Sequence, residues 1–371
     1  DGFSDVQALN NKVNIRLLTT NRFKFFILYN FNSKNTIFEN QNSRIKMNSF
    51  VEEIFNIHSE EEFVKICLQI YELQMDNNPI YSAYSQIILK GEIPKKLEEI
   101  PFLPIEFFKT EQIICVTQKI EEIFLSSGTT GNQSKHLVSD LSIYENSFQN
   151  AFQLFYGDIT DYCILSLLPN YREREGSSLI YMVDDLIKRS KHPKSGFYLN
   201  NYKEVSETIL ELEKNGQKTL LIGVSYALLD LAKNYPIKLK NTIIMETGGT
   251  KGKRKELLKE ELHKLLKEAF SLDSIHSEYG MTELLSQSYS EGDNIFKTPP
   301  WKKVLIRDVN DPLTILGKNR SGGINIIDLA NIYSCPFIAT QDLGRLHEDE
   351  SFSVLGRFDN SDVRGCNLLV Q

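Results

Sequence analysis

The chain alternates between short apolar runs and longer segments in which apolar residues recur at helical spacing. The short runs predict buried strands at 162–168, 219–224 and 242–245. The longer segments predict helices, which span 51–73, 142–155, 179–188, 205–214, 226–235 and 255–270. Because strand and helix follow each other in turn, we predict an α/β fold with a mostly parallel sheet flanked by helices.

Local signals refine the ends of these elements. Ser142 and Glu145 have the spacing of a capping box, which would start the helix at 142–155. Gly216 would end the helix at 205–214. An extended run is expected at 135–138. Beyond residue 289, apolar runs between Gly, Asp and Asn turns predict a β-rich C-terminal subdomain, with strands at 304–307, 324–327 and 351–355.

Residues 1–46 differ in composition from the rest of the chain. They hold seven Lys/Arg, three Asp/Glu, nine Asn and no Met, so they carry about +4, whereas the remainder carries about −11 of the total of −7. Met47 is followed at once by the first helical pattern. We expect 1–46 to be a poorly ordered upstream extension or an expression remnant; a regulatory tail is the alternative.

Charge and cysteine usage exclude several classes of protein. A net charge of −7 and a pI near 5.6 argue against general nucleic-acid binding and against a basic membrane-surface protein. No apolar run is long enough to span a bilayer and no export signal is visible, so we expect a cytoplasmic protein. The five cysteines include no Cys-x-x-Cys pair, which indicates neither a disulfide framework nor a zinc site. Four are expected to be small buried side chains: Cys67, Cys115, Cys163 and Cys335.

The stretch 124–135, Phe-Leu-Ser-Ser-Gly-Thr-Thr-Gly-Asn-Gln-Ser-Lys, changes abruptly from apolar residues to hydroxyls, glycines and a lysine. Small residues let the backbone approach an anion, and Lys135 adds a positive charge. Gln133 stands where a Walker P-loop needs glycine, which disfavours a kinase-type loop. Alone, the stretch fits an ordinary Ser/Gly-rich turn equally well. The residues expected to contact phosphate are Ser126, Ser127, Gly128, Thr129, Thr130 and Gly131.

Three later stretches change that balance. They read Glu-Tyr-Gly-Met-Thr-Glu at 278–283, Thr-Gln-Asp at 340–342 and Gly-Arg-Phe-Asp at 356–359. Together with 124–135, and in the same order, they resemble the motifs of the adenylate-forming superfamily, whose members activate a carboxylate with ATP. The resemblance implies the α/β large domain of that superfamily, and ATP and Mg²⁺ as cofactors.

The resemblance also assigns roles to single residues. Tyr279 would stack on adenine, Thr282 would bond the α-phosphate, and Glu283 would hold Mg²⁺. Asp342 would accept hydrogen bonds from the ribose hydroxyls, although Gln341 replaces the glycine that the family usually has before this aspartate. The further nucleotide-binding residues that it implies are Gly248, Gly249, Gly280 and Arg357.

Within the superfamily, the runs 134–138, 245–252 and 361–366 resemble the acyl-protein synthetase family of bacterial luminescence. That resemblance implies a long-chain fatty acid that becomes acyl-AMP and is then transferred to Cys366, with an acyl-reductase partner. It divides the chain into an adenylate-forming core at 47–355 and a hinge-like motif and tail at 356–371. The small lysine-bearing C-terminal domain of the superfamily is not expected.

Several alternatives stay open at this point. Without the small-domain lysine, the phosphate charge would be offset by Mg²⁺ and Lys135, with Lys251, Arg254 or a partner protein. His136 fits positioning and packing equally well. Phe102, Phe107 and Phe108, near the helix-breaking Pro101 and Pro104, are expected to be buried under the next strand, and the alternative is an acyl-pocket wall. The rival functions are a ligase that uses coenzyme A and an inactive nucleotide-binding partner protein.

Overall fold

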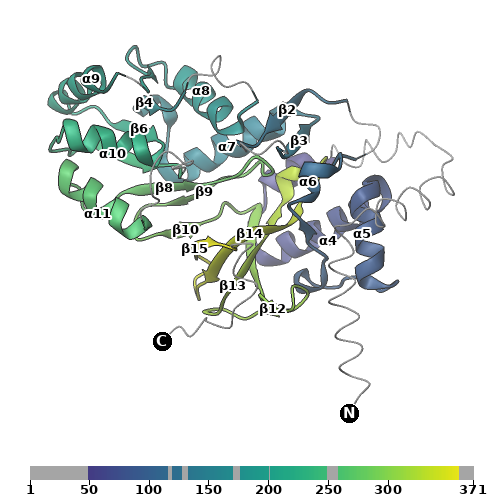
Figure 1. The fold of residues 1–371 in the computed structure, drawn as a ribbon. Coiled ribbons are helices and arrows are strands. Elements are labelled where there is room, and N and C mark those ends of the chain that lie inside the picture. The colour runs from purple at the N-terminus through teal and green to yellow at the C-terminus, as the bar shows by residue number, and fades with distance from the viewer. Residues whose placement is uncertain are drawn as a thin grey trace.

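The computed structural model describes residues 49–115, 119–127, 133–169, 176–199, 201–248 and 258–358 (Figure 1). The expected extension at 1–46 lies outside these residues. Three predicted groups of site residues also lie outside them, namely the centre of the Ser/Gly loop (Gly128, Thr129, Thr130 and Gly131), Gly249 and Cys366.

The parallel part of the sheet comes from the chain between residues 163 and 279. Its strands pair in the order β5-β4-β6-β7-β8, each parallel to the next. They are β4 (Cys163–Leu167), β5 (Gly196–Phe197), β6 (Thr219–Gly223), β7 (Thr242–Glu246) and β8 (His276–Tyr279). The helices around them are α7 (Leu141–Tyr156), α8 (Ser178–Ser190), α9 (Tyr202–Lys214), α10 (Ser225–Asn234) and α11 (Lys259–Phe270). The α/β prediction is therefore confirmed.

The β-rich part predicted beyond residue 289 continues the same sheet in antiparallel pairing. From β8 the order runs through β9, β10, β15, β14, β13 and β11 to β12, and β1 adds to β14. These strands are β1 (Leu103–Pro104), β9 (Ser288–Ser290), β10 (Ile295–Lys297), β11 (Lys302–Arg307), β12 (Ile315–Leu316), β13 (Ser321–Asp328), β14 (Phe337–Leu346) and β15 (Phe352–Arg357). A separate ribbon joins β2 (Glu122–Leu125) to β3 (Lys135–Val138).

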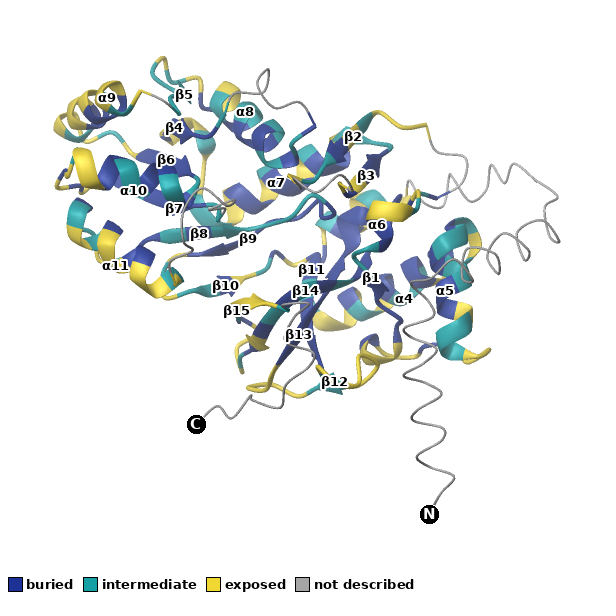
Figure 2. Cartoon of the chain, in the orientation of Figure 1, coloured by how far each residue is buried: buried dark blue, intermediate teal, exposed yellow. Residues whose placement is uncertain are grey.

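Apolar cores lie on both faces of the parallel strands. Leu165 and Leu221 pack with α9, α10 and α11, while Ile164 and Leu220, their neighbours along the strands, belong to the larger core on the other face. Figure 2 shows β4 and β6 in dark blue between helices that have yellow, exposed outer residues. A parallel sheet covered on both faces explains why the strands read as continuous apolar runs.

Helices of the N-terminal part pack against the start of β14. A helix at 49–55 precedes α4 (Glu60–Asn77), α5 (Pro79–Leu89) and the short α6 (Phe107–Thr110). The ring of Phe337 at the start of β14 lies 5.5 Å from Tyr81 and 6.5 Å from Phe102 between centroids. Phe102, Phe107 and Phe108 are all buried, as expected. The short 3-10 turns are η1 (Leu97–Glu99), η2 (Ile159–Asp161) and η4 (Leu329–Asn331).

Two local predictions were wrong. The helix expected at 51–73 is interrupted, because the Ser59 side chain accepts a hydrogen bond from the backbone N–H of Glu62 and starts α4 anew. The cap of α7 is Asp140 rather than Ser142, since the Asp140 carboxylate accepts from both the backbone N–H and the hydroxyl of Ser142. Both a serine hydroxyl and an aspartate carboxylate can cap a helix. Asp140 takes the role here because it lies directly before the first helical residue, Leu141.

The four cysteines in the described part, Cys67, Cys115, Cys163 and Cys335, are free and buried, which confirms their predicted role as small core side chains. Among the described helices, none combines the length and the apolar character needed to cross a bilayer.

Replacing Phe337 with alanine should lower the free energy of unfolding by about 3–5 kcal/mol, because the ring joins the N-terminal helices to the sheet. Leu355→Ala on the neighbouring β15, where the side chain is exposed, should change it by less than about 0.5 kcal/mol. Urea unfolding followed by circular dichroism measures both. Equal effects of the two substitutions would contradict this account of the core.

Candidate active site

Three of the four predicted motifs meet where β8 lies near β14 and β15. Tyr279 ends β8, Asp342 lies in the middle of β14, and Arg357 ends β15. The Tyr279 hydroxyl donates to Asp342 Oδ2 over 2.8 Å, and Arg357 Nε donates to Asp342 Oδ1 over 3.0 Å. Burial and the Asp342 carboxylate raise the pKa of Tyr279 well above its usual value, so its hydroxyl keeps the proton that it donates. Tyr279 thus contacts a carboxylate 63 positions away in sequence and shares it with Arg357.

The exposure of this cluster is uneven. The side chain of Asp342 is 7% exposed and that of Arg357 is 77% exposed, so the guanidinium covers the carboxylate from the solvent side. The Tyr279 ring packs against Phe296 and Phe352, with centroids 5.7 and 5.5 Å away. Each carboxylate oxygen of Asp342 has lone pairs left for further donors. An exposed arginine that moves aside would open this carboxylate to a ligand.

The fourth motif reaches the same place through β3. His136 on β3 is fully buried, and its Nδ1 lies 2.8 Å from the carbonyl oxygen of Thr282. Because a carbonyl only accepts, Nδ1 carries the proton of the neutral ring. Burial lowers the pKa of His136 to about 4, against the effect of the bond to Thr282. His136 therefore positions the turn that carries Thr282, and it also packs edge-on against Phe108 at 5.9 Å.

Glu283 is the second link between that turn and the Ser/Gly stretch. Its side chain is buried, and burial raises the pKa of Glu283, while a hydrogen bond from Ser134 acts in the opposite direction. Its backbone carbonyl accepts from Asn331 Nδ2 over 2.8 Å. The predicted metal ligand is thus a single carboxylate held between two of the motifs. Mg²⁺ that arrives with phosphates needs only one or two such carboxylates, so this residue fits the predicted role chemically.

The ends of the Ser/Gly stretch are tied to each other. Ser126 N–H donates to the carbonyl of Ser134, Ser134 N–H donates to Ser126 Oγ over 2.9 Å, and Gln133 Nε2 donates to the carbonyl of Ser126 over 2.7 Å. Ser127 and Lys135 are exposed on either side of this closure. Gln133, the residue that disfavours a Walker loop, therefore helps to close the loop at its base.

A buried carboxylate holds the backbone at Gly248, one of the predicted nucleotide-binding residues. Glu246 at the end of β7 accepts from Gly248 N–H over 2.7 Å and from Ser277 Oγ over 2.9 Å, and Lys259 Nζ lies 2.8 Å away. Burial alone would raise the pKa of Glu246, but His263, Lys259 and the Gly248 amide lower it to about 2. Gly248 has a φ of 72°, a conformation that glycine adopts without strain. We did not predict this role of Glu246 from the sequence, because a charged residue after a strand is ordinarily exposed.

Lys302 is a second buried charge that we did not predict. Its Nζ donates to the carbonyl of Ser286 over 2.9 Å and lies 5.6 Å from the centre of the Tyr279 ring. Burial lowers the pKa of Lys302 to about 8, although Asp328 and Glu278 favour the charged form. Asp328 in turn accepts from two backbone amides of the turn after Glu283, those of Leu285 and Ser286. No local sequence pattern around Lys302 indicated that it is buried.

The glycine of the Tyr279 motif has a steric reason. A Cβ on Gly280 would lie 2.3 Å from Glu278 Oε1, so a larger residue would displace this carboxylate. Burial raises the pKa of Glu278 to about 7, with the Lys302 charge acting against it. A carboxyl group with a pKa raised to about 7 thus lies next to Tyr279, and no local sequence pattern indicated it.

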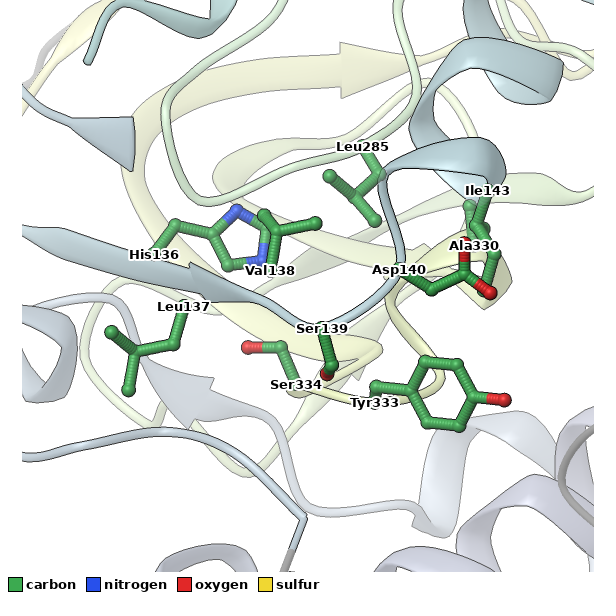
Figure 3. A pocket seen from close by; sticks show the side chains of 10 residues that line it. All are labelled: His136, Leu137, Val138, Ser139, Asp140, Ile143, Leu285, Ala330, Tyr333 and Ser334. Carbon is green, nitrogen blue, oxygen red and sulfur yellow. The ribbon is translucent and has the colours of Figure 1, made fainter. Parts of the chain in front are cut away.

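Figure 3 shows a small cavity beside β3, with His136 on one side and Ser139 and Ser334 below it. Its volume is about 10 Å³, close to the smallest space that holds one water. Within the described residues, His136 Nε2 and Ser139 Oγ are buried without hydrogen-bond partners. Both residues line the cavity, so we regard it as part of the support of His136.

The structure thus describes ten of the predicted site residues and brings most of them together. Tyr279, Asp342 and Arg357 form one cluster, while Thr282 and Glu283 connect to the base of the Ser/Gly stretch. The remaining described residues are Ser126, Ser127, Lys135, Gly248 and Gly280. The roles of all these residues toward a ligand stay predictions.

The state of His136 predicts a pH dependence of stability. Its pKa is about 4 when folded and ordinarily about 6.5, so the unfolded chain takes up a proton first as the pH falls. The contribution of His136 is full above pH 6.5 and is lost between pH 6.5 and 4, by about 3 kcal/mol in total. His136→Gln keeps a donor for Thr282 but does not titrate, and should lose less stability over this range. Urea unfolding at pH 7 and 4.5 tests this, with the exposed His58→Gln as control; equal pH slopes for His136→Gln and native protein would refute it.

Comparison with known proteins supports the resemblance that the motifs indicated. No family model matches the chain. The chain is 24% identical over 324 residues to the long-chain-fatty-acid–luciferin-component ligase of Vibrio harveyi, covering 80% of this chain and 84% of that protein.

Solved structures also match. ATP-bound MatB from Rhodopseudomonas palustris matches 65% of this chain at 18% identity, with a TM-score of 0.47. The O-succinylbenzoate coenzyme A synthetase MenE from Bacillus subtilis, with ATP and magnesium, matches 63% at 16% identity, with a TM-score of 0.42. The chain spans about half the length of these two structures, 48% and 49%. The predicted resemblance is confirmed at the level of sequence, since the chain is similar over four fifths of its length to a long-chain-fatty-acid–luciferin-component ligase.

Proposed function

We propose that this protein is an ATP-dependent adenylate-forming ligase that acts on a long-chain fatty acid and transfers the acyl group to its own Cys366. A carboxylate oxygen of the acid attacks the α-phosphorus of ATP, pyrophosphate leaves with the electrons of the broken P–O bond, and acyl-AMP forms. The Cys366 thiolate then attacks the acyl carbonyl and AMP leaves. The similarity to the Vibrio harveyi ligase supports the acyl substrate.

The observation that carries the proposal is the convergence of the four motifs. The contacts Tyr279–Asp342, Arg357–Asp342 and His136–Thr282 join segments that lie up to 146 positions apart in sequence. A packed core alone would not require an aspartate, a tyrosine hydroxyl and an arginine at one point. Side chains able to bind ribose, phosphate and a divalent cation are what an ATP site needs.

Each described residue has a task in this proposal. Asp342 accepts the ribose hydroxyls after Arg357 moves aside into solvent, and the hydroxyls then replace the donor that the buried carboxylate loses. Thr282, held through its carbonyl by His136, offers its hydroxyl to the α-phosphate. Lys135 and the hydroxyls of the Ser/Gly stretch donate to the other phosphates. Mg²⁺ bound with the nucleotide would neutralise phosphate charge, and Glu283 would hold it as a carboxylate.

The domain boundaries belong to the same proposal. Residues 47–355 would form the adenylate-forming core, 356–371 would carry the hinge-like motif and the acceptor cysteine, and 1–46 would be an extension. The acyl-enzyme would then serve a reductase or another acyl-transfer partner. A cytoplasmic location agrees with the four free cysteines of the described part.

Removing the metal or ribose contact should slow the first half-reaction. Glu283→Gln and Asp342→Asn should each reduce the fatty-acid-dependent exchange of labelled pyrophosphate into ATP by about tenfold to thousandfold, the range for one such contact. Thr130→Val should act in the same direction. Glu268→Gln, an exposed residue of α11, is the matched control and should leave the exchange unchanged. Normal exchange in both Glu283→Gln and Asp342→Asn would place the nucleotide site elsewhere.

Removing the acceptor thiol should separate the two half-reactions. Cys366→Ser should retain pyrophosphate exchange but lose the attachment of labelled fatty acid through a hydroxylamine-sensitive bond, because a serine hydroxyl is a far weaker nucleophile than a thiolate. Mass spectrometry of the C-terminal peptide locates the acyl group in the native protein. Acylation of another cysteine would contradict the role of Cys366. Consumption of added coenzyme A without any acyl-protein would replace this proposal with a ligase that uses coenzyme A.

A further inference from the structure

A cavity of about 630 Å³ opens on the other side of β14 from the Tyr279–Asp342–Arg357 cluster. Its walls come from the end of α5, the segment 92–107, the turn between β11 and β12, and β13 and β14. The volume lies within the range of small-molecule binding sites. In the view of Figure 1 these elements lie at the end of the molecule that carries α5 and β12. The predicted motifs give this cavity no role.

A buried arginine is the main polar feature of the cavity wall. Arg307 on β11 is 9% exposed and donates to the carbonyls of Ile324 and Thr340 and to Asn325 Oδ1. All three acceptors are neutral, and among the described residues no carboxylate pairs with Arg307 within 4.0 Å. Glu106, which also lines the cavity, favours the charged form of Arg307 from a greater distance. Burying a guanidinium is costly, and a carboxylate bound in the cavity would be an anion in direct contact with it.

The structure keeps this arginine in place by a glycine. A Cβ on Gly323 of β13 would lie 2.5 Å from the central carbon of the Arg307 guanidinium. The Phe358 ring, which also lines the cavity, lies 5.5 Å from the same carbon. The guanidinium is therefore fixed between a flat strand surface and an aromatic ring, which suits recognition of a planar carboxylate.

The rest of the wall is largely apolar, and part of it is exposed. Ile93, Val309 and Leu313 line the cavity and are 71%, 41% and 46% exposed. Deeper positions are occupied by Ile88, Phe102 and Phe107. Large apolar side chains that gather at the mouth of a cavity indicate a surface that is covered when a ligand binds. The wall therefore offers one positive charge and a long apolar contact.

The charges at the mouth narrow the choice of ligand. Glu92, Glu98 and Glu99 are exposed there, and Glu106 accepts a 2.6 Å hydrogen bond from Gln341 Nε2 within the cavity. A nucleoside polyphosphate would place several negative charges beside these carboxylates. A ligand with a single negative charge at Arg307 and an uncharged chain toward the mouth avoids this repulsion.

The cavity is separated from the proposed reaction centre by the strand itself. Successive residues of a strand point to opposite faces, and Gln341 faces the cavity while Asp342 faces Tyr279. The same holds at the end of β15, where Arg357 bonds to Asp342 and the next residue, Phe358, lines the cavity. A carboxylate at Arg307 therefore does not share a face with the nucleotide site.

We propose that this cavity is a second, non-reacting binding site for a long-chain carboxylic acid, whose carboxylate pairs with Arg307 and whose chain lies along Phe102, Phe107 and Leu313. The choice of a fatty acid among singly charged amphipathic molecules rests on the proposed function. The site itself rests on the cavity, on an arginine that no carboxylate of the described residues contacts, and on the exposed apolar mouth.

The test uses the full chain without ATP and a long-chain carboxylic acid that carries a photoreactive diazirine. After irradiation, labelled peptides should map to residues 84–107 or 307–316. Leu313→Glu should reduce labelling there at least tenfold, because the probe chain would meet a charge. Leu210→Glu, at a position equally exposed but on α9, should leave labelling unchanged. Both substitutions are at exposed positions, so neither should disturb folding.

Competition by unlabelled compounds tests the chemistry of the ligand. Saturated fatty acids should compete about fourfold better for each added methylene until the cavity is filled. The alcohol of equal length should compete at least tenfold less well, because it lacks the charge for Arg307. Asp342→Asn should lose pyrophosphate exchange yet keep the labelling.

Three results would overturn the proposal: no labelling in these segments, equal labelling of Leu313→Glu and native protein, or equal competition by acid and alcohol. If pyrophosphate exchange is normal in the same preparations, the proposed function stands although the second site falls. Labelling without any exchange would retain the site and remove the proposed function.

Discussion

The backbone pairing of β14 is the constraint on which the other features of the molecule depend. This strand pairs with β13 along one edge. Along the other edge it pairs with the short β1 near its start and with β15 in its second half. Its first residue, Phe337, lies in the aromatic core under the N-terminal helices, and Asp342 in its middle lies in the candidate site. One strand thus transmits the position of the N-terminal helices to the carboxylate. A shift of its register by one residue would exchange Gln341 and Asp342 between the two faces.

Buried charges stabilise the turn that follows β8. Asp328 accepts from the amides of Leu285 and Ser286, and Lys302 donates to the Ser286 carbonyl. Removing such charges from water is costly, and good geometry is required to offset the cost. Here the bonds go to three backbone groups of one turn and to the Ser286 hydroxyl, which also donates to Asp328, so the charges specify the conformation of that turn. That turn carries Thr282 and Glu283. Its position in the candidate site explains why Asp328 and Lys302 are buried in an otherwise apolar core.

The alternation of strands and helices between residues 162 and 270 could be predicted because each element is buried on a periodic face. The longest strand of the C-terminal part, β14, was not predicted. Its sequence Phe-Ile-Ala-Thr-Gln-Asp-Leu-Gly-Arg-Leu has polar residues directed to a binding site and a glycine where a Cβ would lie 2.6 Å from Ile324 Cδ1. Lys302 and Glu246 could not be predicted either, since their burial depends on partners distant in sequence. The convergence of the motifs followed from resemblance, not from any local pattern.

The departure from the family pattern at Gln341 has a physical interpretation. Glycine would leave this position without a side chain, whereas Gln341 reaches across the cavity to the Glu106 carboxylate. Because its side chain lies on the face opposite Asp342, the exchange of glycine for glutamine leaves the Asp342 contacts with Tyr279 and Arg357 intact. It also connects β14 to the segment that leads into α6, beside the wall that holds Phe107. A substitution next to the proposed ribose site therefore changes the cavity behind it, and the two faces of the strand can vary independently.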